Sequence, residues 1–218
     1  MLTIVIPALN AADRLGSCLA ALDGADEVLV VDGGSTDVTV QIAELAGARV
    51  IIAPLGRGSQ LRAGGEAARG DWLLFVHADT RLGAGWREAV AQHIVAACNQ
   101  AGYFDLRLDA AAWQARMIER GVAIRVGLLG LPYGDQGLLI SRRLYDELGG
   151  FRSLALMEDV DLVRRIGRRR LRRLDAVALT SAERWRRDGW LRRSTRNLTC
   201  LALYAVGVSP ARLARFYR

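Results

Sequence analysis

Four short apolar segments alternate with segments of helical spacing over the first 80 residues, and this alternation restricts the fold more than any other feature of the sequence. The expected strands cover residues 2–7, 28–31, 50–53 and 72–76, and the expected helices between them cover residues 10–22, 35–47 and 59–68. This order favours an α/β fold whose central, mainly parallel sheet is covered by helices on both faces. Ligands of such sheets bind beyond the carboxyl ends of the strands.

The rest of the chain is less regular. We expect strands at residues 102–108 and 138–141, and helices at residues 111–126, 142–148 and 158–167. At 218 residues the chain is long enough for one domain with a sizeable core. Because no linker separates the halves, we expect a single domain with two lobes.

The net charge of +7 comes entirely from arginine, because the sequence contains no lysine. The basic excess lies mostly between Arg164 and Arg196, and a basic surface favours anionic partners. We expect this segment to form a solvated face and not to bind nucleic acid. The alternative is contact with an anionic membrane surface through Trp185, Trp190 and an apolar face within residues 198–208.

The three cysteines, Cys18, Cys98 and Cys200, lie far apart and share no metal-ligand spacing. Such a set is typical of reduced thiols in a cytosolic protein. The first residues lack the basic and apolar parts of a signal peptide, and no apolar run reaches the roughly 18 residues of a membrane span. We therefore expect a cytoplasmic protein, with peripheral contact at the inner face of the membrane as the alternative.

The segment VLVVDGGSTD places Asp32 at the end of a strand, before a Gly-Gly turn. Helix capping by Ser35, Thr36 and Asp37 accounts for the polar residues after the turn. It does not account for an acid at the end of a buried strand. The chain has neither the GxGxxG pattern of dinucleotide oxidoreductases nor the GxxxxGK[ST] phosphate loop, so both of these nucleotide-binding classes are excluded.

The fourth expected strand ends in the tetrapeptide HADT, which contains His77 and Asp79. In a parallel sheet Asp79 should lie near Asp32. One interpretation makes Asp79 the cap of a helix in the following TRLGAGW. The other makes it a ligand of Mg²⁺ or Mn²⁺, which take carboxylate and diphosphate oxygens. His77 could donate to a phosphate, bind the metal or end the strand inside the core.

Four motifs occur in the order found in one known family: IPALN, VVDGGSTD, GRGSQLRAGGEAARGDWLLFVHADT and MEDVDLVRRI. From Leu2 to about Arg168 the chain resembles the large inverting glycosyltransferase family 2, with the GT-A (nucleotide-diphospho-sugar transferase) fold. The HADT tetrapeptide, GDQGLLISRRLYDELGGF and YAVGVSPARLARFYR resemble a smaller subgroup, the radical-SAM/selenodomain-associated transferases. The resemblance implies a nucleotide-binding half at residues 1–80, an acceptor half at 81–180 and a C-terminal helical segment at 181–218.

The resemblance also implies which residues bind the nucleotide-diphospho-sugar donor: Pro7, Ala8, Asn10, Asp32, Arg57, Arg62, His77 and Ala78. In the family the first three positions line the nucleoside pocket, and Asp32 would accept a hydrogen bond from the base or the ribose. Arg57 and Arg62 would face the diphosphate, which suits forked guanidinium donors. Arg62 stands where the family more often has asparagine.

Asp79 matches the final acid of the family's DxD motif, which implies that Asp79 holds the metal, Mn²⁺ or Mg²⁺. His77 replaces the first acid of that motif, so the nucleotide-side ligation and the tightness of metal binding stay open.

Glu158 and Asp159 stand at the start of an expected helix. Acids are favourable at a helix N-terminus, and this is one interpretation of the pair. In the family, the residue that matches Asp159 is the general base that removes a proton from the acceptor hydroxyl, which is a poor nucleophile when neutral. Glu158 would orient the catalytic groups.

The expected function is metal-assisted transfer of a sugar from a nucleotide-diphospho-sugar to an acceptor hydroxyl, with inversion. The alternatives are a nucleotidyltransferase, a basic nucleic-acid-binding protein without activity, and a catalytically weak nucleotide-binding homologue. The sequence does not identify the sugar, the base or the acceptor.

Overall fold

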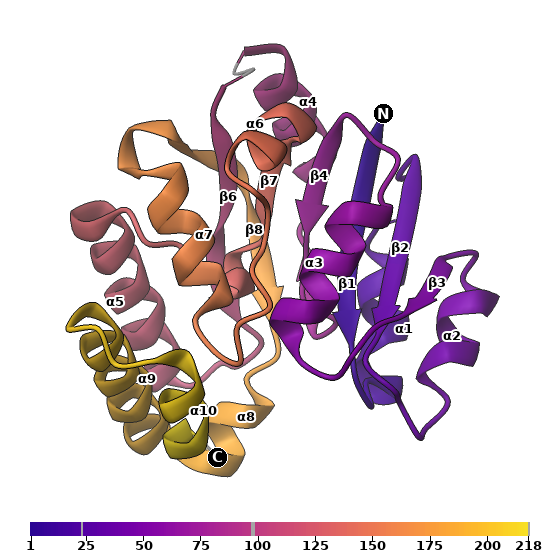
Figure 1. Cartoon of the computed structure of the whole chain (residues 1–218). Helices are drawn as coiled ribbons and strands as arrows, with labels where there is room; N and C mark the ends of the chain where they lie inside the picture. The colour runs from indigo at the N-terminus through magenta and orange to yellow at the C-terminus, as the bar shows by residue number, and fades with distance from the viewer. Residues whose placement is uncertain (23, 97–98, 218) are drawn as a thin grey trace.

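The computed structural model describes residues 1–22, 24–96 and 99–217, and these residues form one eight-stranded sheet of order β3-β2-β1-β4-β7-β6-β8-β5 (Figure 1). The strands are β1 (Leu2–Ala8), β2 (Glu27–Asp32), β3 (Arg49–Ile52), β4 (Trp72–Phe75), β5 (Thr80–Leu82), β6 (Ala101–Leu108), β7 (Leu138–Ser141) and β8 (Leu171–Thr180). The helices are α1 (Ala12–Ala20), α2 (Thr39–Leu45), α3 (Arg57–Ala67), α4 (Trp86–Ala96), α5 (Trp113–Leu129), α6 (Arg142–Glu147), α7 (Glu158–Ile166), α8 (Glu183–Asp188), α9 (Trp190–Ala205) and α10 (Pro210–Tyr217), with 3-10 turns η1 (Gly134–Gln136) and η2 (Arg168–Arg170).

The sheet is mixed. Strands β1, β2, β3 and β4 are parallel to one another, and β6 is parallel to β8. Strand β7 runs antiparallel to both β4 and β6, and β5 runs antiparallel to β8. The expected α/β class with a helix-covered central sheet is therefore confirmed, and strands from both halves of the sequence belong to the same sheet.

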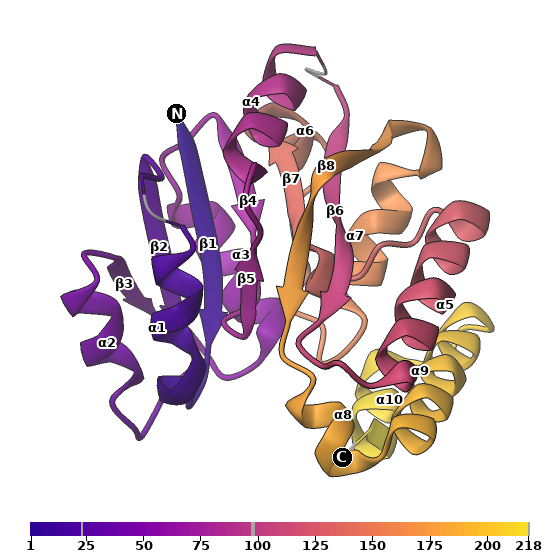
Figure 2. The same ribbon diagram turned by 180° about the vertical axis from the view of Figure 1, so that it is seen from behind.

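Helices cover both faces of the sheet, because the central strands are apolar on both sides. Within β1, Ile4 and Ile6 belong to a core cluster with residues of α1 and α4, whereas Val5 belongs to a second cluster with residues of α3, α6 and α7. Alternate residues of a strand point to opposite faces, which explains this division. Figure 1 shows α3 and α7 on one face, and Figure 2 shows α1 and α2 on the other.

The order in which the chain adds strands to the sheet reverses at β1. After β1 it adds β2 and β3 on one side, and β4 then pairs with the other side of β1. A crevice forms beyond the carboxyl ends of the strands at such a reversal, and ligands of α/β sheets bind there. The ends of β1 and β4, together with the start of α3, therefore define where the site is built.

Several expected element boundaries are wrong. Helix α2 begins at Thr39 and has no side-chain cap, so Ser35 and Thr36 do not cap it. Helix α1 begins at Ala12 and not at residue 10, and it too has no side-chain cap. Residues 80–82 form strand β5 and not a helix, which removes the interpretation of Asp79 as a helix cap.

Strand β8 was not expected, because its sequence has no clear strand period. Helices α8, α9 and α10 lie within residues 181–218, the segment for which the resemblance implied helices. Cys18 and Cys200 are free and buried, as expected for reduced thiols. Cys98 lies outside the described residues.

Gly64 lets α3 approach the sheet closely. A Cβ at this position would lie 2.3 Å from a methyl carbon of Val5 and 2.8 Å from one of Val31. We expect Gly64→Ala to lower the free energy of unfolding, because overpacking costs about 1–3 kcal/mol and outweighs the gain in helix propensity.

Gly121, in the middle of α5, is the matched control because a Cβ there meets nothing within 4 Å. Gly121→Ala should raise the free energy of unfolding by about 0.5–1 kcal/mol. Urea denaturation of both variants measures the two effects, and a stabilised Gly64→Ala would contradict the close approach of α3.

Candidate functional site

A large cavity of about 420 Å³ lies beyond the ends of β1 and β4. A smaller cavity of about 120 Å³ adjoins it on the side of α7 and the C-terminal helices. The residues that line both cavities, called here the junction, are Arg57, His77, Leu156, Arg184, Arg193 and Tyr217. The larger volume is in the range of small-molecule sites in proteins.

The loop after β1 forms one wall of the large cavity, with Pro7, Ala8 and Asn10 in its lining. Asn10 has a left-handed backbone conformation (φ 47°). Its side-chain Oδ1 accepts a hydrogen bond from the backbone N–H of Thr36 at 2.9 Å, and its backbone N–H donates to Ser35 Oγ at 2.9 Å. Asn10 therefore ties the β1 loop to the loop after β2.

Asp32 is buried and bonded within its own loop. Its carboxylate accepts hydrogen bonds from the backbone N–H groups of Gly34 (2.8 Å) and Ser35 (2.9 Å), and also from the Ser35 hydroxyl. These bonds hold the turn after β2 in shape. Asp32 supports the cavity wall in this structure, and its contact with a nucleoside stays a prediction.

Gln60 is a site residue that sequence reasoning missed. It is buried in α3, lines the large cavity, and donates from Nε2 to the backbone carbonyls of Ala8 (2.7 Å) and Val31 (2.8 Å). The side chain therefore joins the ends of β1 and β2 beneath the cavity. The sequence showed only an amide side chain on an expected helix. The two carbonyls that Gln60 binds lie 52 and 29 residues away in the chain.

Arg57 of the junction forms an ion pair with Glu158, which also lines the large cavity. Arg57 is the first residue of α3 and Glu158 is the first residue of α7, and Glu158 is only 1% exposed. Burial raises the pKa of Glu158 and outweighs the opposing effect of Arg57. Burial would lower the pKa of Arg57, but Glu158 and Asp159 outweigh it and raise this pKa. The pair therefore holds one guanidinium toward both cavities.

Arg62 does not reach either cavity in this structure. It lies five residues after Arg57, which places it about 140° around the helix. Its exposed side chain pairs with Glu66 at 2.8 Å. Arg62 therefore lines neither cavity in this structure, and its contact with the diphosphate stays a prediction.

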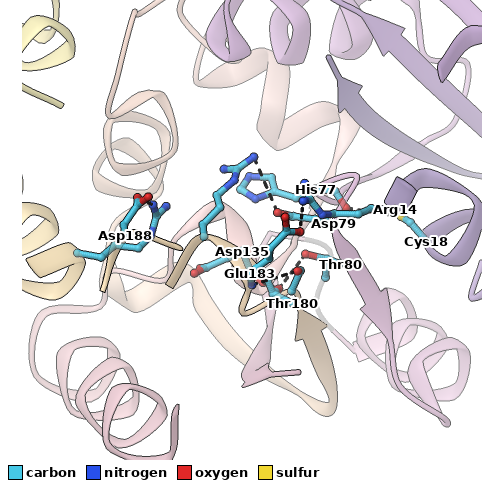
Figure 3. Close-up of polar contacts among 12 residues, drawn as sticks. Arg14, Cys18, His77, Asp79, Thr80, Asp135, Thr180, Glu183 and Asp188 are labelled. Carbon is cyan, nitrogen blue, oxygen red and sulfur yellow. Dashed lines mark hydrogen bonds and ion pairs between the residues drawn. The ribbon is translucent and has the colours of Figure 1, made fainter. Parts of the chain in front are cut away.

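The HADT segment brings His77, Ala78 and Asp79 to the large cavity. Below them, the hydroxyls of Thr80 and Thr180 are 2.8 Å apart and join β5 to β8. Asp79 lies 3.9 Å from a guanidinium nitrogen of Arg184. Figure 3 shows Asp79 beside His77, with Thr80 and Thr180 below them.

His77 stands between the two cavities as a neutral imidazole. Burial lowers the pKa of His77 to about 4, and the nearby Arg57 acts in the same direction. Its neighbour is Gly134, where a Cβ would lie 2.6 Å from His77 Nε2 and 3.4 Å from Asp159 Oδ2. Only glycine leaves room for these side chains.

Asp159 lines the small cavity, as does Asp135. The Asp159 carboxylate accepts hydrogen bonds from the backbone N–H groups of Gly134 (2.9 Å) and Val160 (2.8 Å). Asp135 Oδ1 is buried and has no hydrogen-bond partner. The sequence analysis missed Asp135, although it lies in the GDQG motif that carried part of the resemblance.

The C-terminal helices complete the small cavity with Arg184, Trp185, Arg193, Asn197 and Tyr217. None of these residues was predicted to lie at the site. Of the five, only Tyr217 lies in a motif that carried the resemblance, the closing YAVGVSPARLARFYR.

The rings of Trp185 and Trp190 stack with centroids 6.2 Å apart. Both pack against the cluster that contains Leu106 and Ala115. The two tryptophans are therefore partly buried against this cluster, and their contact with a membrane surface stays a prediction.

Comparisons with known proteins agree with this geometry. The family described as "Glycosyl transferase family 2" matches residues 3–106. An uncharacterised glycosyltransferase of Mycobacterium tuberculosis is 39% identical over 84 residues. A PGL/p-HBAD biosynthesis glycosyltransferase of the same organism is 40% identical over 93 residues. These matches cover 38% of this chain and span only 38% and 36% of the respective relatives.

Solved structures support the fold. Glucosyl-3-phosphoglycerate synthase from Mycobacterium tuberculosis, in complex with Mn²⁺, UDP and glucosyl-3-phosphoglycerate, is 21% identical with a TM-score of 0.56. That match covers 83% of this chain and 70% of the synthase. The same synthase with Mg²⁺ and UDP gives a TM-score of 0.61 at 20% identity, over 83% of this chain and 69% of the synthase. The chain therefore has the GT-A fold.

Asp135 gives the site a testable pH dependence. Burial raises the pKa of its carboxyl to about 6, against about 3.9 in an unfolded chain. Between these values the folded protein binds a proton that the unfolded chain has released, so this group makes stability fall as pH rises. We expect Asp135→Asn to gain stability over the wild type as pH rises from 4 to 7.

Chemical denaturation across this pH range measures the effect. The exposed Asp146→Asn variant is the control, and its stability should follow the wild type. Parallel curves for Asp135→Asn and the wild type would contradict the raised pKa.

Proposed function

We propose that the protein is a glycosyltransferase that moves a sugar from a nucleotide-diphospho-sugar to an acceptor hydroxyl, with inversion at the anomeric carbon. The observation that carries the proposal is the pair of cavities with a shared wall. The larger one would accommodate a nucleotide, the smaller one presents the Asp159 carboxylate, and arginines line both of them. The match of residues 3–106 to glycosyl transferase family 2 supports the same activity.

The donor would occupy the large cavity. Pro7, Ala8 and Asn10 would line the nucleoside pocket, with Asp32 behind them in the loop that Asn10 fixes. Arg57 would face the diphosphate, held in place by Glu158. Such preorganised cations stabilise the charge that develops on a leaving diphosphate.

Asp79 would hold Mn²⁺ or Mg²⁺. Within residues 1–22, 24–96 and 99–217, no three His, Cys, Asp or Glu side chains are grouped as a metal site. Mg²⁺ is usually held by one or two carboxylates together with substrate phosphates, so the Asp79 carboxylate at the cavity wall fits such an ion. When bound, the ion supplies a Lewis acid for the diphosphate.

Asp159 would act as the general base on the acceptor. The N–H groups of Gly134 and Val160 orient its carboxylate at the small cavity. A proton taken from the acceptor hydroxyl would pass to this carboxylate as the hydroxyl oxygen attacks the anomeric carbon. Attack from the side opposite the diphosphate inverts that carbon.

The acceptor carries a hydroxyl, and nucleic acid is not among the partners we propose. In the described part of the chain, no helix has both the length and the apolarity to cross a membrane. Contact of the basic C-terminal third with an anionic membrane surface stays a prediction. So does the division into a nucleotide-binding half, an acceptor half and a C-terminal helical segment within one domain.

The general-base role predicts a selective loss of transfer. Asp159→Asn keeps the shape of the side chain but removes its basicity, so transfer should fall about 100-fold or more while donor binding stays nearly intact. Turnover with the donor found in a nucleotide-sugar screen, and calorimetry with the same donor, measure the two quantities. Asp146→Asn, on the exposed surface, should match the wild type in both. Transfer at the wild-type rate by Asp159→Asn would refute the role.

The metal role predicts an effect of chelation. Nucleoside diphosphate should bind the wild type more tightly with Mn²⁺ than with EDTA, because an ion held by Asp79 would neutralise charge on the diphosphate. Asp79→Ala should lose most of this difference. Calorimetry with UDP in the two buffers tests the prediction, and equal affinities in the wild type would remove the metal from the proposal.

A further inference from the structure

Arg193 is a buried cation at the junction of the two cavities. It lies in α9, is 9% exposed and lines both cavities. One of its terminal nitrogens donates to Asp188 at 2.7 Å and the other to the Tyr217 hydroxyl at 3.3 Å. Its Nε is buried and has no hydrogen-bond partner. Buried donors of this kind are nearly always paired, with protein, water or ligand.

The charges around Arg193 are not balanced. Asp188 is shared by Arg187, Arg193 and Arg196. The side chains of Arg193 and Arg196 are only 10% and 19% exposed, so one carboxylate faces two largely buried guanidinium groups. Arg196 Nε is also buried without a partner. Burying a charge is costly unless the charge is paired, and a bound anion would supply the missing partner.

The other two arginines of the junction differ in what they already bind. Arg57 is committed to Glu158. Arg184 is half exposed and its carboxylate partner Asp79 is 3.9 Å away, beyond a hydrogen bond. Arg184 and Arg193 are therefore the guanidinium groups with donors to spare.

We propose that helices α8–α10 form an anion clasp, in which Arg193 and Arg184 bind a phosphate or carboxylate group at the junction and Tyr217 positions Arg193. Forked guanidinium donors suit such oxyanions. The proposal deepens the proposed function, because the anion is either the donor's diphosphate or an acidic group on the acceptor.

The first experiment measures binding of inorganic pyrophosphate by calorimetry with the full chain in EDTA, so that no metal takes part. Arg193→Gln should weaken binding about tenfold or more, the scale of a lost hydrogen bond to a charged group. Arg192→Gln is the matched control, since Arg192 is the exposed neighbour of Arg193. This variant should bind pyrophosphate as the wild type does.

Arg193 also holds the C-terminal helices together, so its loss could unfold them. Thermal melting identifies that case, and Arg184→Gln is the second variant because its side chain is 51% exposed. Arg184→Gln should weaken pyrophosphate binding without a change in melting temperature. The clasp is overturned if a folded Arg193→Gln and Arg184→Gln both bind pyrophosphate with wild-type affinity.

A second titration identifies the source of the anion. If Arg193→Gln lowers the affinity for UDP but not for uridine, the clasp holds the donor's diphosphate. If it leaves UDP binding intact and lowers the affinity of UDP-saturated protein for inorganic phosphate, the clasp holds an acidic acceptor. An equal loss of uridine, UDP and phosphate binding would show a structural role only and would overturn the clasp.

These measurements do not depend on sugar transfer. A protein that binds pyrophosphate through Arg193 but transfers no sugar would keep the clasp and lose the proposed function. A protein that transfers sugar with unchanged anion affinity in the Arg193 and Arg184 variants would keep the function and lose the clasp.

Discussion

The ion pair between Arg57 and Glu158 joins the two halves of the chain at the point where they share a site. Arg57 begins α3 in the first half, and Glu158 begins α7 in the second. The Glu158 carboxylate is buried, whereas the Arg57 side chain is 36% exposed. Burying the carboxylate is costly, and the attraction of Arg57 offsets part of this cost. Because Asp159 follows Glu158 directly, the same contact fixes an arginine for the large cavity and a carboxylate for the small one.

The arginines of the basic segment do more than form a solvated face. Arg165 donates to the backbone carbonyls of Leu148 (2.5 Å) and Gly150 (2.8 Å) and pairs with Asp161. Arg168 donates to two carbonyls at the end of α5. A guanidinium has five donors in a fixed fork, so it can hold several carbonyls that end a helix or a loop. Lysine would not reproduce these contacts, which gives a structural reason for the exclusive use of arginine here.

The first half of the fold could be predicted from the sequence, and the second half only in part. Apolar runs such as residues 2–7 are buried on both faces, and the helical spacing between them is clear. The family resemblance then identified His77, Asp79 and Asp159, which the fold brings to the two cavities. These three residues could be found from local sequence patterns, because each lies just after an expected strand or at the start of an expected helix.

The remaining site residues depend on contacts between distant parts of the chain. Tyr217 lines the junction only because α10 packs back on α9, and its hydroxyl accepts from Arg193. Gln60 matters because two strand ends lie above it. Arg62 belongs to the same motif as Arg57, yet it pairs with Glu66 and lines neither cavity. No local pattern specifies such contacts, which are set by how elements pack.

The lack of space at Gly134 has a consequence for both cavities. A Cβ there would lie 2.6 Å from His77 Nε2 and 3.4 Å from Asp159 Oδ2, and the N–H of Gly134 donates to the same carboxylate. A side chain at this one position would therefore disturb an imidazole that lines the large cavity and a carboxylate that lines the small one.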